Sequence, residues 1–538
     1  MLCFPQFWEA FCSTPYAKES LTIDGNRQLP LEVPIVSRIT SRTNISLRGL
    51  LTVACCAAIG CSGNPTSPSA ASAKTVPAPI SPIGALLAPS PTLVSSEEWP
   101  TFAHDMLRSS VQPGSSQITT GTVATLQPLW IFRSPAPYDL AAPIVDNGIV
   151  YTADLTGHVT ALNARSGQVI WQRSFGVGIK LTPSSYDGHI FVGTLDGSTP
   201  SARSTLMALD PRTGATQWQA SIDGGLHGSP VAISGRLFVP VTLGDPGYCH
   251  PGGVYLFDEK TGNSGVSWLT GGSVASDGGA VWSPLSYDGA RIYFGTGNTC
   301  VDTPQTSNAV VALDTSTALA WSFQTSSPVT DDDVGGGVLQ SGGTAYVTGK
   351  NGNIYALDPA SGNLRWQRAL GSPDEDGSYS TPAVAAGTLI TSVGFKVDPS
   401  GQVPAGTQFG ALLGLDPSSG SQRWEVDAIS PFFSPPAIVD NMAFTTVDEQ
   451  AVALDAASGR LLWSSPIEAP SRTQPVVAED QLFVADSNGN LFAFGIPTSG
   501  NPASRERMAF RSKAAQHRWQ NPFRFIPAFC RLRQPSRS

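Results

Sequence analysis

The chain has 538 residues, only 14% of them charged, and a formal net charge of -9 at pH 7. Ordinary globular chains are about 25% charged. The negative net charge argues against a nucleic-acid-binding protein, because phosphate binding needs clustered Lys and Arg. The 54 glycines and 44 prolines favour many short strands joined by tight turns over helix bundles. The sequence has no run of eighteen or more apolar residues, so we expect no membrane-spanning helix.

Residues 1–61 are interpreted as an export signal with an atypical N-terminal extension. Arg38, Arg42 and Arg48 precede the apolar run "GLLTVACCAAIG", which leads to Cys61. This is the order of segments in a secretory signal. The residues "AIGC" resemble a bacterial lipoprotein box, which places a lipid on Cys61; cleavage without lipidation is the alternative. We therefore expect a protein of the periplasm or cell envelope that touches the membrane only through a lipid anchor.

Three further regions follow along the chain. Residues 62–97 are rich in Ser, Pro and Ala and cannot bury a core, so they are interpreted as a linker. Residues 98–497 contain the repeats described next. Residues 498–538 are basic with little periodicity and are expected to be disordered, with a functional basic tail as the alternative.

The repeat region is self-similar, which is the strongest signal in the sequence. The unit ends in an apolar alternation, an Asp or Asn, a Ser/Thr-Gly turn and a Trp, as in "HVTALNARSGQVIW" and "IYALDPASGNLRW". Between these units are strand–turn–strand pieces such as "APIVDNGIVYTADLTG". Each repeat therefore predicts four short antiparallel strands, the content of one β-propeller blade.

The recurring tryptophans give the number of blades. Eight of them predict an all-β fold, an eight-bladed propeller in which each indole packs between neighbouring blades and has no catalytic role. The first has no repeat before it and the last repeat lacks its own Trp, so we expect the N-terminal strand to complete the last blade and close the ring. The eight are Trp130, Trp171, Trp218, Trp268, Trp321, Trp366, Trp424 and Trp463.

Two cysteines, Cys249 and Cys300, lie in the repeat region. Both stand in Gly/Pro-rich loops of adjacent repeats, and disulfides persist in exported proteins, so the pair predicts a bridge. Two free buried thiols are the alternative.

The repeat "NGNIYALDPASGNLRW" resembles the repeat of pyrroloquinoline-quinone (PQQ) propellers. That fold family also includes non-enzymatic lipoproteins that help to assemble outer-membrane barrels. Residues 98–132, "EWPTFAHDMLRSSVQPGSSQITTGTVATLQPLWIF", resemble the entry segment of PQQ-dependent alcohol dehydrogenases. Residues 280–360 resemble their active-site blades, with the polyvinyl-alcohol dehydrogenase branch nearer than the methanol branch.

The resemblance implies a cofactor site that includes Trp282 and Asn298. Trp282 stands outside the repeat register and matches a Trp that lies flat beneath the quinone, a role that suits the broad face of an indole. A Trp covering the rim of the funnel is the alternative. Asn298, in "FGTGN", matches a metal ligand, and its amide oxygen suits Ca²⁺. A plain Gly-Asn turn is the alternative.

The implied catalytic residues are Asp333 and Lys350. Asp333, in "SPVTDDDVGGG", falls on the family's catalytic carboxylate, a general base beside calcium and one of its ligands. Asp331 and Asp332 leave the match ambiguous, because three successive acids are also typical of a solvated loop. Lys350, in "GKNGNIYALD", matches a cation that hydrogen-bonds the reactive quinone oxygen, or is an ordinary surface lysine. Gly335 lacks the extra acid of lanthanide-using relatives, which favours calcium.

The weakest match is Asp245, near the family's Glu metal ligand but one methylene shorter and in a different loop. The family's adjacent disulfide-forming Cys pair has no counterpart in the repeat region. The sequence contains no C-x-x-C-H haem attachment motif, so electrons would pass to a separate acceptor such as a cytochrome c.

Three functions remain open at this point. The first is a quinoprotein that binds PQQ and Ca²⁺ and oxidises a small alcohol. The second is a non-catalytic propeller lipoprotein that acts as an envelope scaffold or binding module. The third is an enzyme fold that retains relics of a lost site, which the missing Cys pair and Glu favour.

Overall fold

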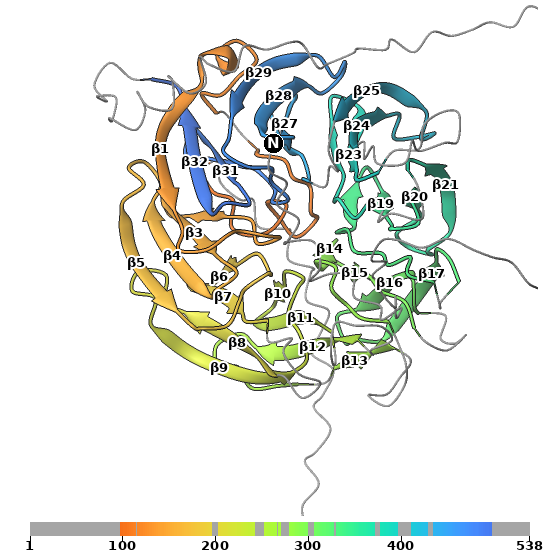
Figure 1. Ribbon diagram of the computed structural model, residues 1–538. Coiled ribbons are helices and arrows are strands. Elements are labelled where there is room, and N and C mark those ends of the chain that lie inside the picture. The colour runs from red at the N-terminus through yellow and green to blue at the C-terminus, as the bar shows by residue number, and fades with distance from the viewer. Residues whose placement is uncertain are drawn as a thin grey trace, which may run out of the picture. The chain divides into compact units, whose positions relative to one another are not determined.

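The computed structural model describes residues 97–113, 116–195, 203–242, 252–265, 267–270, 279–299, 306–327, 330–371, 377–395, 410–428 and 434–497. The chain divides into two units, Met1–Pro82 and Ile83–Ser538, and the described residues all lie in the second. Within this unit, eight four-stranded antiparallel sheets follow one another around a ring (Figure 1). The predicted all-β, eight-bladed β-propeller is confirmed.

The first four blades are each formed by four consecutive strands, which run from the innermost strand outward. Blade 1 contains β2 (Ile144–Asp146), β3 (Ile149–Ala153), β4 (His158–Asn163) and β5 (Val169–Ser174). Blade 2 contains β6 (Ser184–Tyr186), β7 (His189–Gly193), β8 (Arg203–Leu209) and β9 (Thr216–Asp223). Blade 3 contains β10 (Val231–Ile233), β11 (Arg236–Thr242), β12 (Gly252–Asp258) and β13 (Trp268–Leu269). Blade 4 contains β14 (Ser286–Tyr287), β15 (Arg291–Gly295), β16 (Ala309–Asp314) and β17 (Leu319–Gln324).

The remaining blades repeat the arrangement, and a short 3₁₀ turn, Val123–Thr125, precedes β1. Blade 5 contains β18 (Leu339–Ser341), β19 (Thr344–Thr348), β20 (Asn353–Leu357) and β21 (Leu364–Ala369). Blade 6 contains β22 (Ala383–Ala385), β23 (Thr388–Val393), β24 (Gly410–Leu415) and β25 (Gln422–Ala428). Blade 7 contains β26 (Ala437–Val439), β27 (Met442–Val447), β28 (Gln450–Asp455) and β29 (Leu461–Pro466). Blade 8 contains β30 (Val476–Ala478), β31 (Gln481–Ala485), β32 (Asn490–Gly495) and β1 (Gln127–Arg133).

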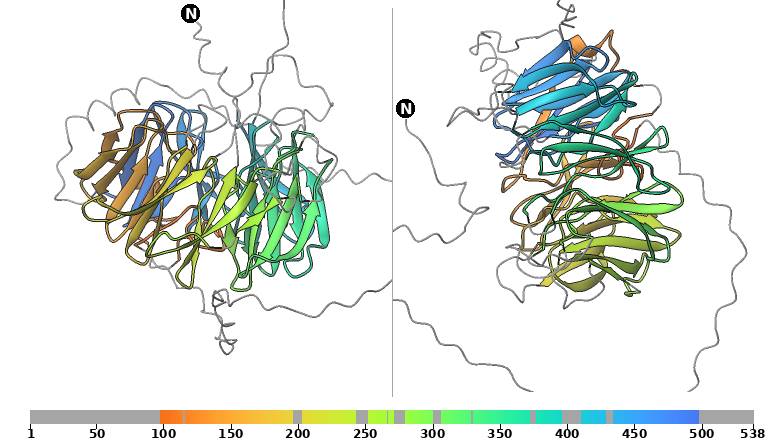
Figure 2. Two further views of the ribbon diagram at one scale, coloured as in Figure 1. Left: turned by 90° about the horizontal axis from the view of Figure 1, so that it is seen from below. Right: turned by 90° about the vertical axis from the view of Figure 1, so that its right-hand side faces the viewer.

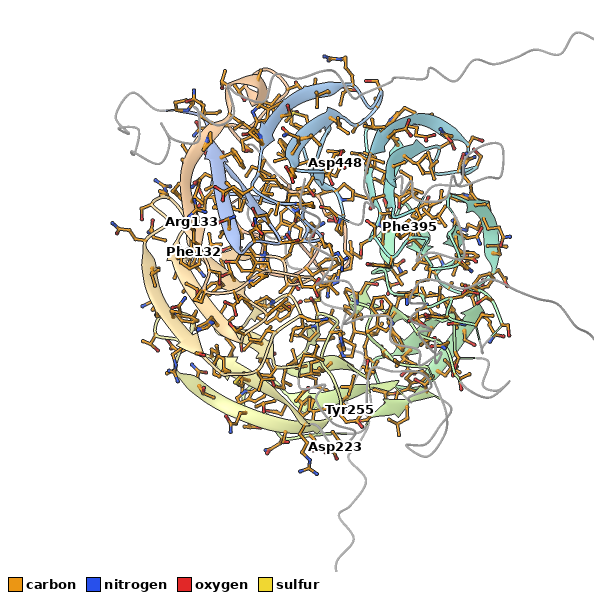
Figure 3. All side chains as sticks on the ribbon, viewed as in Figure 1. Phe132, Arg133, Asp223, Tyr255, Phe395 and Asp448 are labelled. Atoms are coloured by element: carbon orange, nitrogen blue, oxygen red, sulfur yellow. The ribbon has the colours of Figure 1, made fainter. Side chains whose placement is uncertain are left out.

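The two ends of the repeat region meet in blade 8. Its outermost strand is β1, which pairs antiparallel with β32, so the orange and blue strands lie side by side in Figure 1. Phe132 and Arg133, labelled in Figure 3, lie on this strand. The predicted closure by the N-terminal strand is confirmed, and it pairs the two strand edges that an open ring would expose.

The hydrophobic core lies between neighbouring blades, which Figure 2 shows edge-on. The middle strands have a blade on each side and read as continuous apolar runs, such as β24, in which every residue is buried. The outermost strands face solvent and bury few residues. In β5 only Trp171 is buried.

Seven of the eight recurring tryptophans each donate a hydrogen bond from one blade to the next. Trp321, on the last strand of blade 4, donates its indole N–H to the carbonyl oxygen of Pro359 in blade 5 at 3.0 Å. Its ring lies against Gly362, where φ is +74° and an added Cβ would come within 2.6 Å of the indole. Glycine is therefore required by both backbone and packing. The other six indole donors are Trp130, Trp171, Trp218, Trp366, Trp424 and Trp463, at 2.9–3.2 Å from their carbonyl acceptors.

Trp268 differs from these seven. It is partly exposed and packs edge-to-face on Phe294 of blade 4, with 5.4 Å between ring centroids. The corresponding turn of blade 4 is one residue shorter than in the six other blades that have this turn, and it places Thr317, at φ +70°, where those six have a glycine. A side chain at that position prevents the close indole packing seen elsewhere.

The segment 99–112 lies inside the ring and bonds to the innermost strands (Figure 1). Trp99 exchanges backbone hydrogen bonds with Val145 of β2, and Leu107 accepts one from Gln340 of β18. The Arg108 side chain is fully buried and donates to the carbonyl oxygens of Leu285 (2.6 Å) and Pro230 (3.2 Å). With its bonds to β6, β14, β26 and β30, the segment contacts seven blades. It covers the inner strand edges and supports the loop that follows Trp282.

Candidate functional site

The sequence-predicted site residues lie on connections at one face of the ring. In each blade the chain enters the innermost strand from this face, and the hairpin between the second and third strands returns to it, because successive strands are antiparallel. Trp282 precedes β14, Asp333 precedes β18, Asn298 follows β15, and Lys350 lies in the hairpin between β19 and β20.

Asp333 is the centre of this group. Its Oδ2 accepts a hydrogen bond from Trp282 Nε1 at 3.1 Å, and its Oδ1 accepts one from the backbone N–H of Asn298 at 2.8 Å. Lys350 Nζ lies 3.5 Å from Oδ2, and the Asp333 side chain is 13% exposed. Burial raises the pKa of the Asp333 carboxyl, and Lys350 is the largest influence in the opposite direction. A buried carboxylate held by donors from three other segments is typical of a functional site.

Lys350 contacts two carboxylates and an aromatic ring. Its Nζ is 3.1 Å from Asp331 Oδ1 and 5.8 Å from the centroid of the Trp282 ring, within the range of a cation–π interaction. Its backbone N–H donates to the carbonyl oxygen of Asp333 at 2.9 Å, which ties the hairpin to the Asp333 loop. Lys350 is therefore not an isolated surface lysine.

Trp282 is held by close packing at its six-membered ring. An added Cβ at Gly335 would lie 1.7 Å from Trp282 Cη2, so only glycine fits at position 335. A carboxylate side chain there, as in lanthanide-using relatives, has no room. Tyr379 packs edge-to-face on the indole at 5.8 Å, and Ser283 Oγ donates to the carbonyl oxygen of Gly336 at 2.9 Å.

Asn298 takes part through its main chain. The contact with Asp333 comes from the backbone N–H, and the side chain is partly buried beside it. The close approach depends on Gly297, where an added Cβ would lie 2.7 Å from Asp333 Oδ1. The turn glycine and the amide donor of "GTGN" thus position Asp333, a role that the sequence pattern did not indicate.

The structure adds Asp331 and Tyr379 to the group. Asp331 was ambiguous in the sequence because of its acidic neighbours, and its contact with Lys350 distinguishes it from Asp332, which accepts from Thr330 Oγ1 at 2.8 Å. Tyr379 occupies the same place before β22 as Trp282 before β14, and each is followed by Ser and a nearby Pro. That pattern was a signal that could have identified it.

Four predicted residues lie outside the described part of the chain. The proposed third metal ligand, the proposed disulfide and the proposed lipidation site therefore remain predictions. They are Asp245, Cys249, Cys300 and Cys61.

The described residues do not complete a metal site. Calcium takes six to eight oxygen ligands, whereas Asp331 and Asp333, the two carboxylates of this group, share the Lys350 ammonium. No group of three or more His, Cys, Asp or Glu side chains is placed to hold a metal within the described ranges. What the group does offer is an aromatic ring, an ammonium donor and a carboxylate.

A family model with the description "Outer membrane protein assembly factor BamB", built of PQQ-type repeats, matches residues 119–202, 202–396 and 391–520. The chain belongs to this repeat family. It is 28% identical over 167 residues to outer membrane protein assembly factor BamB of Pseudomonas aeruginosa, covering 30% of this chain and 39% of that protein. It is 25% identical over 178 residues to BamB of Yersinia pestis, covering 30% and 41%. The chain thus spans about two fifths of these relatives.

Solved structures with the same fold include enzymes. A quinohemoprotein alcohol dehydrogenase from Comamonas testosteroni has a TM-score of 0.65 at 18% identity, covering 76% of this chain and 82% of that one. A europium-containing methanol dehydrogenase has a TM-score of 0.62 at 16% identity, covering 74% and 98%. BamB from Moraxella catarrhalis has a TM-score of 0.51 at 16% identity, covering 69% and 99%. At these identities the similarity shows the fold alone. In the described residues, no helix is long and apolar enough to cross a membrane.

Proposed function

We propose that this propeller is a quinoprotein that binds PQQ and oxidises a small alcohol at the Trp282–Asp333–Lys350 group. The observation that carries the proposal is the convergence on one carboxylate of an indole N–H, a backbone N–H and an ammonium group, each from a separate connection. The resemblance of residues 280–360 to dehydrogenase active-site blades supports the same reading.

Each side chain has a chemical role in this proposal. Trp282 would hold the flat ring system against its face, and Lys350 would donate a hydrogen bond to a ring carbonyl. Asp333 would accept the hydroxyl proton of the alcohol, because a carboxylate with a raised pKa is a better proton acceptor than an exposed one. PQQ, when bound, supplies the two-electron acceptor. The Trp282 and Asn298 N–H groups keep the carboxylate in place for that proton transfer.

The roles proposed for these side chains do not involve Ca²⁺. The described residues supply too few oxygen ligands, and Lys350 stands between the two nearest carboxylates. Asp245, the further ligand predicted from the resemblance, lies outside the described residues. Gly335 has no room for the acidic side chain that the resemblance associates with lanthanide-using relatives, so calcium is the metal to test.

The cellular setting belongs to the proposal as well. The signal-like run before Cys61 supports export to the periplasm or cell envelope with a lipid on that cysteine. The proposed electron acceptor is a separate protein such as a cytochrome c.

The test is reconstitution of the full chain with PQQ, with and without Ca²⁺, followed by dye reduction with a panel of primary and secondary alcohols. We expect alcohol-dependent reduction that Asp333→Asn lowers by a factor of about 10² or more, the usual contribution of a general base. Asp332→Asn is the matched control, because its carboxylate contacts Thr330 rather than the site. Failure of the wild-type chain to bind PQQ would exclude the proposal.

A non-catalytic envelope scaffold is the second candidate. The match to the BamB family model and to BamB of two bacteria favours it. It predicts that the chain binds no PQQ and that Asp333→Asn leaves its binding to an envelope partner unchanged.

A further inference from the structure

The central segment, residues 99–112, bonds to both blades that form the candidate site. Met106 accepts a backbone hydrogen bond from Tyr287 of β14 at 2.7 Å, and Leu107 accepts one from Gln340 of β18 at 2.9 Å. The connection into β14 carries the indole of the site, and the connection into β18 carries its carboxylate. Two successive residues of the segment therefore join the innermost strands of blades 4 and 5.

Arg108 holds the connection that contains Trp282. Its Nε donates to the carbonyl oxygen of Leu285 at 2.6 Å, and Leu285 follows Trp282 by three residues. Its Nη2 donates to the carbonyl oxygen of Pro230, just before β10, at 3.2 Å. One guanidinium group therefore joins the entries of blades 3 and 4.

The other end of the guanidinium group fixes Phe102. Arg108 Nη1 donates to the Phe102 carbonyl oxygen at 2.5 Å and to Thr101 Oγ1 at 3.0 Å. The Phe102 ring lies against Gly337, where an added Cβ would be 3.5 Å from the ring. Gly337 belongs to the connection that contains Asp333. Arg108 is thus linked to the connections of both blades that form the site.

The backbone around Arg108 adopts an unfavourable conformation at several positions. Residues with a side chain occupy the left-handed region rarely, and they keep it only where the surrounding contacts impose it. Such positions concentrate at functional sites. Four residues of the segment have φ between +54° and +74°: Ala103, His104, Arg108 and Ser110.

The geometry of the guanidinium group suits a positioning role. Arg108 is fully buried, and its acceptors within 3.2 Å lie on the connections into blades 3 and 4 and on the segment itself. A planar fork presents its donors in fixed directions, so these acceptors cannot move relative to one another without breaking a hydrogen bond. Removing a charge from water is costly, which argues against a side chain that only fills space.

We propose that Arg108 is a positioning residue for the candidate site, because its bonds set where Trp282 stands relative to Asp333. The hydrogen bond of 3.1 Å between these two side chains joins blade 4 to blade 5, so its length depends on how the two connections are held. The effect on catalysis rests on the proposed function, whereas the placement of the indole does not.

The first test observes the indole N–H of Trp282 by NMR in the full chain labelled with ¹⁵N-tryptophan, without quinone. The cross-peak is assigned by its absence from Trp282→Phe. Arg108→Met removes every donor of the guanidinium group and keeps an unbranched side chain. We expect it to shift or broaden the Trp282 cross-peak, because the hydrogen bond to Asp333 is no longer held at its length.

Gln112→Met is the matched control on the same segment. Gln112 is also buried, and its Nε2 donates to the carbonyl oxygens of Val477 in blade 8 (2.7 Å) and Glu98 (3.1 Å). Both variants should lower the free energy of unfolding, but only Arg108→Met should move the Trp282 cross-peak. An unmoved cross-peak in Arg108→Met, or an equal movement in Gln112→Met, would overturn the proposal.

Phe102→Ala keeps the test decisive if circular dichroism shows that Arg108→Met does not fold. Phe102 is partly exposed, so we expect this variant to fold. It removes the contact with Gly337 on the Asp333 side, and it should also move the Trp282 cross-peak. A wild-type cross-peak in Phe102→Ala would then reject the positioning role.

The second test measures turnover of the chain reconstituted with PQQ. Arg108→Met should lower kcat for the alcohol by up to about 10²-fold, the cost of a misplacement of about 1 Å, and should change the amount of quinone retained much less. In the Trp282→Phe background the same substitution should lower kcat by a smaller factor, because the bond that it positions is already absent. Equal factors in both backgrounds would show that Arg108 acts independently of that bond.

The two tests separate this inference from the proposed function. If the Trp282 cross-peak moves in Arg108→Met but the wild-type chain binds no PQQ, the positioning role stands and only the proposed oxidation fails. If the chain oxidises alcohols and Arg108→Met changes neither the cross-peak nor kcat, the oxidation stands and the positioning role fails.

Discussion

Trp282 Nε1 donates a hydrogen bond to Asp333 Oδ2 across 3.1 Å, although 51 residues separate them and they lie on connections that enter different blades. The bond joins an aromatic ring suited to stacking with a carboxylate suited to proton transfer. Its removal therefore tests whether the two act together.

Trp282→Phe keeps an aromatic face at this position and removes the N–H. A hydrogen bond to a charged group contributes about 1.5–3 kcal/mol, so we expect alcohol-dependent dye reduction to fall by about ten-fold or more. The amount of quinone retained should change much less. Steady-state kinetics and the absorbance of bound quinone measure the two effects. Unchanged turnover with lost quinone would contradict a positioning role for the N–H.

Lys350→Met should move the pH dependence of activity to higher pH. Only an ionised Asp333 accepts a proton, so activity rises as this carboxyl deprotonates. Lys350 favours the ionised form and counteracts the effect of burial on the pKa of Asp333, and the methionine variant loses this influence. Lys350→Arg retains a cation and should keep the wild-type midpoint. Profiles of kcat/KM against pH for the wild type and the two variants measure this midpoint. The same midpoint in all three proteins would show that Lys350 does not influence the ionisation of Asp333.

His227 should make the fold sensitive to acid. Burial lowers its pKa to about 4 in the folded protein and 6.5 is its ordinary value, so between these pH values the unfolded chain holds a proton that the folded chain lacks. The free energy of unfolding therefore falls as pH is lowered through this range. His227→Gln should reduce that loss by about 3 kcal/mol between pH 7 and pH 4. Urea unfolding at several pH values measures it, and parallel curves for the two proteins would show that His227 is not responsible.

The docking tryptophans should differ in their contribution to stability. Trp321→Ala removes a buried indole and its hydrogen bond to Pro359, which should cost about 3–5 kcal/mol. Trp268→Ala removes a partly exposed ring that faces Thr317 rather than a glycine, and should cost about 2 kcal/mol or less. Urea unfolding of the two variants measures the difference. Equal losses would contradict the account of the shortened turn.

The architecture was predictable because the strand alternation and the Trp that ends each repeat recur along the sequence. The indole spacing gave eight blades, and the unpaired Trp130 indicated that the N-terminal strand closes the ring. The exception at Trp268 was also visible in the sequence, since Asp314 precedes Trp321 by seven residues whereas Asp358 precedes Trp366 by eight. Because this repeat keeps its Trp, the pattern predicts an ordinary blade there despite the one-residue deletion.

The candidate site was predictable only through resemblance. Asp333 and Lys350 belong to blade 5, whereas Trp282 and Asn298 belong to blade 4. A local sequence pattern gives no information about contacts between loops of two different blades. The backbone N–H of Asn298 can reach Asp333 because Gly297 has no side chain to keep the two loops apart. In the sequence, Gly297 indicates only a turn. The partners of Asp331 and Asp332 likewise depend on where Lys350 and Thr330 lie.

A segment of the chain links the blades from inside the ring. Residues 99–112, with Arg108 fully buried among backbone carbonyls, bond to the innermost strands of six blades and to Pro230, just before the innermost strand of a seventh. One short stretch of chain thus couples blades whose strands are up to about 330 residues apart in the sequence, so disturbing Arg108 should loosen many blades at once rather than one.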